Sequence, residues 1–177
     1  MNTPLYSTLL YSTLFSIRDQ LLHSGRSLVL AESCTAGLVA AKLGLIPGIS
    51  NFFCGSMVVY QSRSKIDWLE VDSEGLLDPN RGPVSGWASL SLAKGVLLAT
   101  PRANVSAAIT GHFGPNAPPN QDGQVYCAIM TREGNIQQWN FHLESPAPIL
   151  ATDCELRLAR QEEAACRFLF WIAESLP

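Results

Sequence analysis

Apolar and polar positions along the chain predict helices and strands in turn. Thr3 before Pro4 is typical of a helix start, and Gly25 stands where this helix would end. Between them the apolar residues of one helical face are Leu10, Leu14, Ile17 and Leu21. The apolar run 28–31 follows, with the length of a buried strand. The pattern therefore predicts a first helix that leads into a buried strand.

The same pattern predicts four more strands and four more helices. The strands are expected at 52–60, 104–109, 124–130 and 136–143. The helices are expected at 38–45, at 64–69, after Ser85, and from a capping box of Thr152 and Glu155 to about residue 175. Between them, 72–83 predicts turns and 111–123 a long loop. We expect an α/β fold, a three-layer α/β/α sandwich with a mixed β-sheet.

The composition indicates one compact domain over residues 1–177. Apolar residues make up 47% of the chain and charged residues 15%, and no repeat or linker divides it. Twelve basic and fifteen acidic residues give a net charge of −3, which excludes the strong positive footprint of a dedicated nucleic-acid binder. The chain has no basic leader and no run of about 18 apolar residues, so we expect a cytoplasmic protein without a membrane partner.

Residues that bind metals are scattered along the chain. The five cysteines are odd in number and form no C-x-x-C pair, and the three histidines lie far apart. This spacing supports neither a disulfide framework nor a zinc site. We expect no metal and no cofactor.

The first candidate site is the turn after the first strand, Ser33-Cys34-Thr35-Ala36-Gly37. Such a turn lies at the carboxyl edge of the sheet, where open α/β folds keep their ligands. Free N–H groups at the start of the next helix could hold an anion or an oxyanion. A helix start could also lower the pKa of Cys34 and make it reactive. Local pattern alone favours simpler roles, a helix cap for Ser33 or Thr35 and a buried thiol for Cys34.

The second candidate is Lys65, five residues after Tyr60 at the end of the second strand. If Lys65 lies in the first helical turn, the helix dipole would lower its pKa. A lysine that loses its proton near neutrality can serve a serine nucleophile as general base. The alternatives are a solvated surface lysine and a tyrosine whose hydroxyl lies in water.

The third candidate is the segment from Ile109 to Asn116, a strand followed by a loop that contains glycines. Glycines let backbone N–H groups approach a ligand closely. Neither the Walker nor the dinucleotide-binding spacing is present. His112 could donate to a substrate, although a single loop histidine is usually just exposed.

Together and in this order, these segments resemble the CinA C-terminal domain family, whose characterised members include nicotinamide mononucleotide deamidases. The matching stretches are Ala31-Glu32-Ser33-Cys34-Thr35-Ala36-Gly37, Pro47-Gly48-Ile49-Ser50, Val59-Tyr60 with Lys65, Gly82-Pro83-Val84-Ser85, and Thr110-Gly111 with Gly114-Pro115. The resemblance covers residues 5 to 175, and it is to the stand-alone form of the domain.

The resemblance implies a serine amidohydrolase with a Ser/Lys dyad, which converts nicotinamide mononucleotide to nicotinate mononucleotide and ammonia. Ser33 would be the nucleophile, Lys65 its base, and Tyr60 a residue that assists in proton handling or orientation. The residues implied in substrate binding are Thr35, Ser50, Thr110, Gly111 and Gly114. The partners implied are a small-molecule nucleotide substrate and a second copy of the chain in a homodimer.

The sequence departs from the family pattern at the substrate-binding end. Ala36 replaces a glycine, and His112 and Phe113 replace small residues. Asp153 stands where the family has an arginine suited to a substrate phosphate, and Arg157 or Arg160 could substitute for it. Two alternatives stay open, an amidase on a different carboxamide and a non-catalytic paralogue that binds a nucleotide or a protein partner.

Overall fold

The computed structural model describes residues 4–118, 120–143 and 152–176, which form one five-stranded mixed sheet with helices on both faces. The strands are β1 (Leu28–Glu32), β2 (Phe53–Val58), β3 (Val105–Gly111), β4 (Gln124–Thr131) and β5 (Ile136–His142). They lie in the order β2-β1-β3-β4-β5. β1 pairs in parallel with β2 and β3, whereas β4 pairs antiparallel with β3 and β5. The mixed sheet predicted from the sequence is therefore confirmed.

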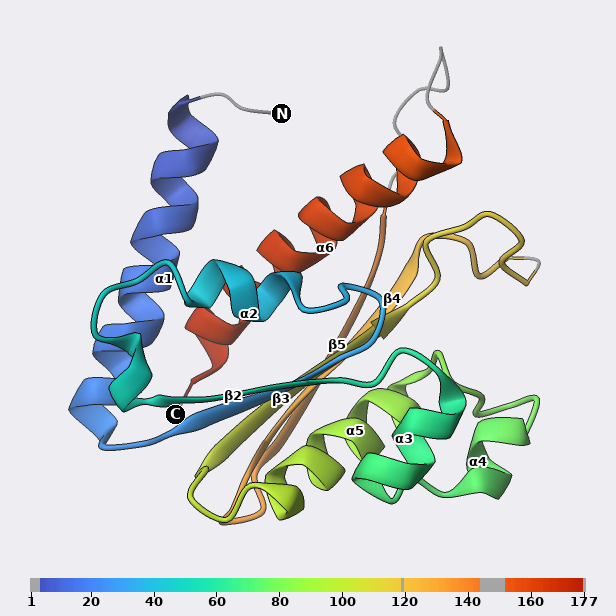
Figure 1. The fold of residues 1–177 in the computed structure, drawn as a ribbon, viewed down its shortest axis with the longest axis horizontal. Coiled ribbons are helices and arrows are strands. Elements are labelled where there is room, and N and C mark those ends of the chain that lie inside the picture. Colours follow the sequence, from blue (N-terminus) through green and yellow to red (C-terminus); the bar gives the residue numbers. More distant parts are fainter. Residues whose placement is uncertain (1–3, 119, 144–151, 177) are drawn as a thin grey trace.

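The helices form two outer layers (Figure 1). One layer contains α1 (Pro4–Ser24), α2 (Leu38–Leu43) and α6 (Asp153–Ser175). The other contains α3 (Ser62–Leu69), α4 (Ser73–Leu77) and α5 (Gly86–Ala99). The short 3-10 helix η1 (Ile49–Asn51) precedes β2. This arrangement is the predicted three-layer α/β/α sandwich.

The central strand β1 supplies both halves of the core. All five of its residues are buried. Because side chains alternate along a strand, Leu28 and Leu30 join the cluster under α1, α2 and α6, while Val29 and Ala31 join the cluster under α5. This two-sided burial explains why β1 reads as a continuous apolar run, and it fixes the position of the turn that follows it.

Most predicted elements are found, and the differences are local. The segment 72–83, predicted as turns, contains the short helix α4, because the Asp72 carboxylate accepts hydrogen bonds from the N–H groups of Glu74 and Gly75. α3 begins at Ser62, two residues before the predicted start. Ser85 caps α5, and the capping box of Thr152 and Glu155 opens α6, as predicted. Thr3, the predicted cap of α1, lies outside the described residues.

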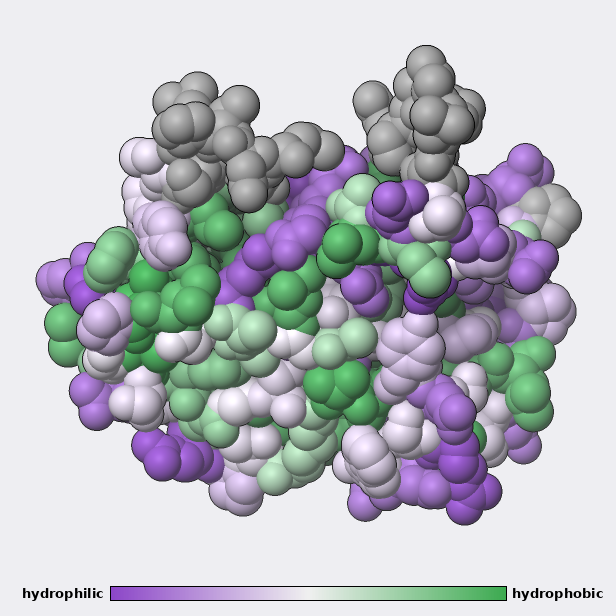
Figure 2. Space-filling view, turned by 45° about the horizontal axis from the view of Figure 1, so that its top comes forward, coloured by the Kyte–Doolittle hydropathy of each residue, from purple (hydrophilic) through white to green (hydrophobic). Residues whose placement is uncertain are grey.

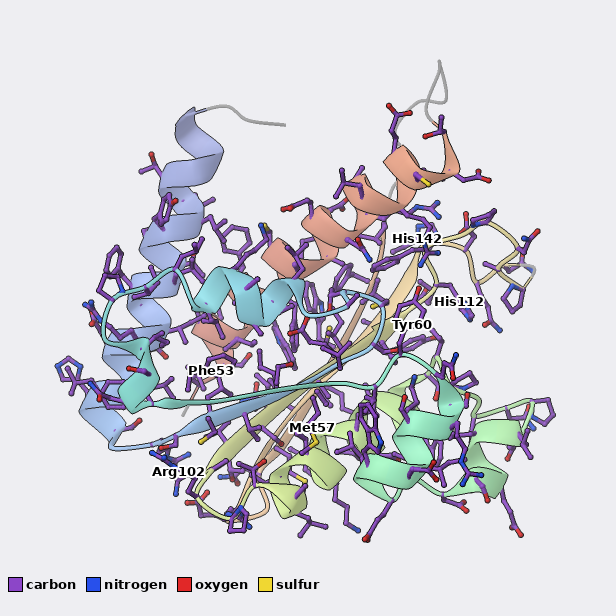
Figure 3. The ribbon with its side chains drawn as sticks, in the orientation of Figure 1. Phe53, Met57, Tyr60, Arg102, His112 and His142 are labelled. Atoms are coloured by element: carbon purple, nitrogen blue, oxygen red, sulfur yellow. The ribbon has the colours of Figure 1, made fainter. Side chains whose placement is uncertain are left out.

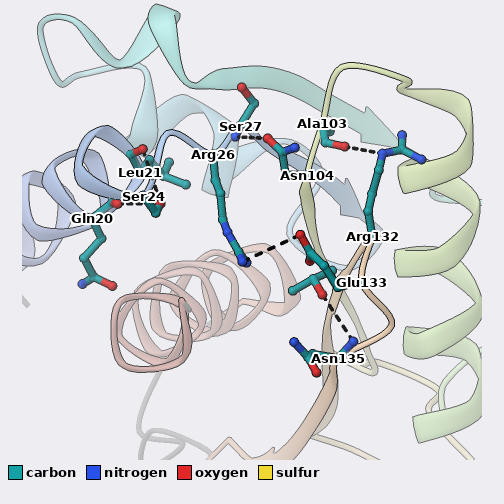
Figure 4. A network of polar contacts seen from close by, with 11 residues as sticks. Gln20, Leu21, Ser24, Arg26, Ser27, Ala103, Asn104, Arg132, Glu133 and Asn135 are labelled. Atoms are coloured by element: carbon teal, nitrogen blue, oxygen red, sulfur yellow. Dashed lines mark hydrogen bonds and ion pairs between the residues drawn. The ribbon is translucent and has the colours of Figure 1, made fainter.

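A polar network closes the end of the sheet opposite the carboxyl ends of β1 and β3 (Figure 4). The Asn104 side chain accepts a hydrogen bond from the Ser27 N–H at 2.9 Å. Arg132 donates to the carbonyl oxygen of Ala103 at 2.6 Å, and Arg26 lies 3.8 Å from Glu133. These contacts bind the turns at this end to one another, so this end has a structural role.

The surface over α1 carries several apolar side chains. Figure 2 shows hydrophobic atoms gathered on the side of the molecule where α1 lies. The large apolar residues exposed on this helix are Leu9, Tyr11, Phe15 and Leu22. Among the helices of the described part, none is long and apolar enough to cross a membrane.

Candidate active site

The carboxyl ends of the three parallel strands meet at one pocket. Ser33 follows β1, Tyr60 follows β2, and Gly111 ends β3, so strand pairing alone brings these three segments together. They border a cavity of about 250 Å³. Figure 3 shows Tyr60 and His112 at this end of the sheet, with Phe53 and Arg102 at the opposite end. The residues that line the cavity include Ser33, Tyr60, Lys65, Thr110, Gly111, His112, Gly114 and Arg157.

Lys65 contacts Ser33 directly, although 32 residues separate them. The Lys65 Nζ lies 3.0 Å from the Ser33 Oγ. It also donates to the backbone carbonyl oxygens of Val59 at 2.8 Å and Tyr60 at 3.2 Å. When the amine is neutral, these two carbonyls can take its two N–H groups and leave its lone pair for the Ser33 hydroxyl. The arrangement fits a lysine that accepts a proton from serine.

The surroundings of Lys65 favour its neutral form. The side chain is buried, and no carboxylate of the described residues forms an ion pair with it. Burial lowers the pKa of Lys65 from 10.5 to about 8. The sequence predicted a lower pKa from the helix dipole. The direction is confirmed, but the main cause is loss of solvent around the charged amine.

The start of α2 is already occupied by a carboxylate. Glu32 is fully buried, and it accepts hydrogen bonds from the N–H groups of Gly37, Val39 and Ala40 at 2.9–3.1 Å. The expectation that these N–H groups are free for an anion or oxyanion is therefore wrong. Between residues 33 and 41 of the described chain, the N–H groups of Cys34 and Thr35 are the ones that donate to no carbonyl or carboxylate oxygen, and both face the Cys34 sulfur.

Cys34 is a buried thiol rather than an activated nucleophile. Its side chain lies in the cluster formed by the α1, α2 and α6 face of the sheet. Burial raises the pKa of the Cys34 thiol far above its ordinary value. The alternative of a reactive cysteine at this turn is therefore wrong, since the reactive species would be the thiolate.

Tyr60 takes part in the site through two different atoms. Its carbonyl oxygen accepts from Lys65, whereas its hydroxyl accepts a hydrogen bond from Arg157 Nη2 at 2.5 Å. Its side chain is half exposed. Arg157 also donates through Nη1 to the carbonyl oxygen of Gly114. The Tyr60 hydroxyl is thus directed to the rim of the pocket and to α6.

The loop segment 112–117 forms the opposite side of the pocket, and the residues that lead into it are tightly packed. The Thr110 hydroxyl donates to the carbonyl oxygen of Pro83 at 2.9 Å. A side chain at Gly111 would lie 2.9 Å from the carbonyl oxygen of Gln124, so only glycine fits there. Gly114 has φ of +61° and precedes a cis peptide bond to Pro115. Burial lowers the pKa of His112, which keeps its ring neutral near pH 7.

An ion pair between a buried arginine and an exposed aspartate ties this loop to α6. Arg160 is only 1% exposed, and its Nη1 and Nη2 donate to the two carboxylate oxygens of Asp122 at 2.7 and 2.9 Å. Arg157, one helical turn earlier, is the arginine that lines the pocket. Asp153, at the start of α6, is exposed and does not line the pocket. Of the two arginines considered as substitutes, Arg160 is therefore held by Asp122, and Arg157 faces the cavity.

Two residues of the predicted substrate-binding set lie elsewhere. Thr35 is buried below the turn, where its hydroxyl donates to Glu32 at 2.8 Å. Ser50 is exposed on η1 and does not line the cavity. The structure brings Thr110, Gly111 and Gly114 together with Ser33 and Lys65 in the pocket lining.

Sequence reasoning missed Glu32 and Asp122 as residues of this region. Glu32 had one signal, an acidic residue at the end of an apolar strand where a buried charge needs partners. Asp122 had none, because its partner Arg160 lies 38 residues away. Among the described residues, no group of three or more His, Cys, Asp or Glu side chains could hold a metal ion.

Comparison with known proteins agrees with the fold and the strand-end motifs. The family model of the CinA C-terminal domain matches residues 12–153. A CinA-like protein of Syntrophotalea carbinolica is 36% identical over 129 residues, which cover 71% of this chain and 31% of that protein. A CinA-like protein of Desulfotalea psychrophila is 37% identical over 121 residues, which cover 67% of this chain and 29% of that protein. The chain thus spans about a third of the length of these relatives.

Solved structures match over nearly the whole chain. The competence/damage inducible protein CihA of Agrobacterium tumefaciens is 30% identical with a TM-score of 0.77, covering 92% of this chain and 94% of that one. A CinA superfamily protein of Klebsiella pneumoniae has the same fold, with a TM-score of 0.81 at 23% identity over 94% of this chain and 97% of that one. Fold and pocket define an α/β domain with a pocket at the carboxyl ends of its parallel strands. The chain belongs to the CinA C-terminal domain family.

Proposed function

We propose that the protein is a serine amidohydrolase that deamidates nicotinamide mononucleotide to nicotinate mononucleotide and ammonia. The observation that carries this proposal is the 3.0 Å contact between Lys65 Nζ and Ser33 Oγ. It is supported by the lowered pKa, about 8, of a buried lysine that has no acidic partner among the described residues. Functional sites are where such perturbed groups concentrate.

In the proposed reaction, the Ser33 Oγ attacks the carboxamide carbon while its proton passes to Lys65 Nζ. The carbonyl oxygen becomes an oxyanion, for which the N–H groups of Cys34 and Thr35 are the candidate donors on the nucleophile's own turn. When the intermediate collapses, the C–N bond breaks and Lys65 returns its proton to the leaving nitrogen, which departs as ammonia. The product of this half-reaction is an ester of Ser33.

Water completes the cycle by the same proton path. Lys65 takes a proton from a water molecule as its oxygen attacks the ester carbon. The C–O bond to Ser33 then breaks, and the Lys65 proton goes to the Ser33 Oγ. The acid leaves and the enzyme is restored, with no metal or cofactor required by the scheme.

Arg157 is the residue that we propose for the substrate phosphate. It is the arginine of the pocket lining, and a guanidinium binds phosphate oxygens with two parallel hydrogen bonds. In the described structure its Nη atoms contact the Gly114 carbonyl and the Tyr60 hydroxyl. Phosphate binding would exchange these contacts for charge-assisted ones.

One observation favours the second candidate, an amidase on another carboxamide. Arg157 already has two neutral acceptors, and His112 and Phe113 line the pocket beside it. A neutral substrate would leave these contacts in place. A substrate panel with and without phosphate separates the two candidates.

The test is ammonia release from nicotinamide mononucleotide by the wild type, Ser33→Ala and Lys65→Ala. Lys94→Ala is the matched control, since Lys94 is exposed on α5. We expect turnover in the wild type and the control, and a loss of about 1000-fold or more in both site variants. A wild type that binds the nucleotide but releases no ammonia from any carboxamide would instead indicate the non-catalytic paralogue.

A further inference from the structure

The fully buried Glu32 carboxylate lies next to the proposed nucleophile, yet the reaction scheme gives it no task. Five donors surround it, which are the Thr35 hydroxyl, the Ser56 hydroxyl and the N–H groups of Gly37, Val39 and Ala40. A buried carboxylate is costly unless such donors compensate it. Each oxygen of Glu32 has its own set, three donors at Oε2 and two at Oε1.

These donors come from three different parts of the fold around the pocket. The Thr35 hydroxyl and Gly37 N–H belong to the turn that carries Ser33, Val39 and Ala40 belong to α2, and Ser56 belongs to β2. β2 leads directly to the residues that hold Lys65, since Val59 and Tyr60 supply its two carbonyl acceptors. Glu32 therefore links the Ser33 turn to the strand that positions Lys65.

The turn needs such a link because its backbone is unfavourable on its own. Ala36 has φ of +52° and Gly37 has φ of +96°, so two successive residues lie in the left-handed region. This conformation is unfavourable for alanine, and it persists only where surrounding contacts impose it. The hydrogen bonds from Thr35 and Gly37 to Glu32 enclose Ala36 on both sides.

We propose that Glu32 is a positioning residue that fixes the Ser33 Oγ within hydrogen-bond distance of Lys65 Nζ. It acts by holding the left-handed turn against α2 and β2. The inference rests on the proposed function in so far as Ser33 is the nucleophile. Glu32 itself touches neither the substrate nor the reacting atoms.

Glu32→Gln tests this role, because it keeps the shape of the side chain but replaces one acceptor oxygen by an NH₂ group. Whichever way the amide is turned, its NH₂ group faces at least one backbone N–H, that of Ala40 at one oxygen position or those of Gly37 and Val39 at the other, because only the hydroxyls can turn to accept. Asp72→Asn is the matched control, since it removes a carboxylate charge that accepts two N–H groups at the start of α4.

The first measurement is the rate at which a fluorophosphonate labels Ser33, followed by mass spectrometry. The Ser33 Oγ bonds to phosphorus, fluoride leaves, and the proton goes to Lys65. We expect labelling about 100-fold slower in Glu32→Gln than in the wild type, with KM for a carboxamide substrate little changed, because a displacement near 1 Å is enough for such a loss. Labelling at the wild-type rate would overturn the inference. Asp72→Asn should label normally.

Two further measurements keep the test decisive. If Glu32→Gln does not fold, Ser56→Ala removes a single donor from Glu32, and we expect labelling slowed by about threefold. An unchanged rate would count against the positioning role of Glu32.

If the wild type is not labelled, the proposed function fails, and amide hydrogen exchange then tests the holding role of Glu32 separately. The N–H groups of Gly37, Val39 and Ala40 should lose protection in Glu32→Gln, and retained protection would refute the holding role.

Discussion

The two sides of the pocket are held in place by different kinds of contact. The inner side is formed by Ser33 and Lys65, with Glu32 buried behind them, and these side chains bond largely to backbone groups close to them in sequence. The outer side, formed by the loop residues 112–118 and 120–123, is held by two arginines of α6. Their partners in the loop lie 38 to 43 residues away.

Because the two sides are held differently, the residues proposed for catalysis are separate from the residues proposed to bind the rest of the substrate. The inner side depends on short, water-excluded hydrogen bonds, which salt and surface substitutions hardly affect. The outer side depends on long side chains whose partners can change without disturbing the nucleophile. Of the departures from the family pattern, His112, Phe113 and Asp153 fall on the outer side or on α6, whereas Ala36 lies in the turn that carries Ser33. The same chemistry could thus be directed to different carboxamides.

The largest effect is expected when the inner side loses its amine. Lys65→Met should abolish amidase activity, by about 1000-fold or more, because Ser33 would lose its base. It should also raise the free energy of unfolding at pH 7 by about 1 to 2 kcal/mol, since an amine without an ion-pair partner is no longer buried. Thermal unfolding and ammonia release measure both. A destabilised Lys65→Met would contradict the view that Lys65 is retained at a cost to stability.

The outer side should respond to loss of its ion pair mainly through stability. Asp122→Ala removes the carboxylate partner of the buried Arg160 guanidinium, and we expect a loss of about 1 to 2 kcal/mol, because Asp122 itself is half exposed. Asp122→Val combined with Arg160→Leu removes both charges and should recover most of that loss. Urea unfolding of the three proteins measures this. A double variant as unstable as the single one would show that the pair is not a self-contained unit.

Arg157→Ala should affect binding more than chemistry. We expect KM for nicotinamide mononucleotide to rise by about 10- to 30-fold, with kcat nearly unchanged, because the guanidinium contacts the phosphate and not the amide. The same compound without its phosphate is the control substrate, and its KM should not change. Equal effects on both substrates would move Arg157 from recognition to a structural role at the rim.

The pH dependence should follow the inner side alone. Since the base must be neutral, kcat/KM should rise about tenfold per pH unit and level off near pH 8, the pKa of Lys65. Stability should also rise with pH between about 8 and 10.5, where the unfolded chain holds a proton that folded Lys65 has lost. Arg157→Ala should keep the same midpoint. A midpoint that moves with Arg157 would show that the two sides are coupled.

The smallest effect is expected at Ala36. Ala36→Gly removes a left-handed alanine, and we expect a gain of about 0.5 to 1 kcal/mol in the free energy of unfolding with activity unchanged. Thermal unfolding and ammonia release are the measurements. A clear loss of activity would show that the alanine side chain itself matters to the turn.

How much of the fold and of the site the sequence predicts depends on how far apart in the sequence the contacting residues lie. The layers and strands were predictable, because β1 and the capped helices α5 and α6 have patterns of apolar and capping residues that lie close together in the sequence. Ser33 and Lys65 were predictable as a pair only through the family resemblance. The contacts of Arg157 and Asp122 were not, because they arise when α6 folds over a loop far away in sequence. The binding role predicted for Ser50 remains a prediction, as its exposed position on η1 does not test it.

The contacts of Arg157 also set a limit on selectivity. The Arg157 guanidinium already has hydrogen-bond partners, since the Gly114 carbonyl and the Tyr60 hydroxyl accept hydrogen bonds from it. Any anion that enters must displace them, so the measured affinity reports an exchange of partners rather than the full strength of a new ion pair. A phosphate would therefore be preferred over no phosphate by a smaller factor than an unengaged arginine would give. The pocket is consequently expected to tolerate a range of carboxamides, with the phosphorylated ones ranked first by a modest margin.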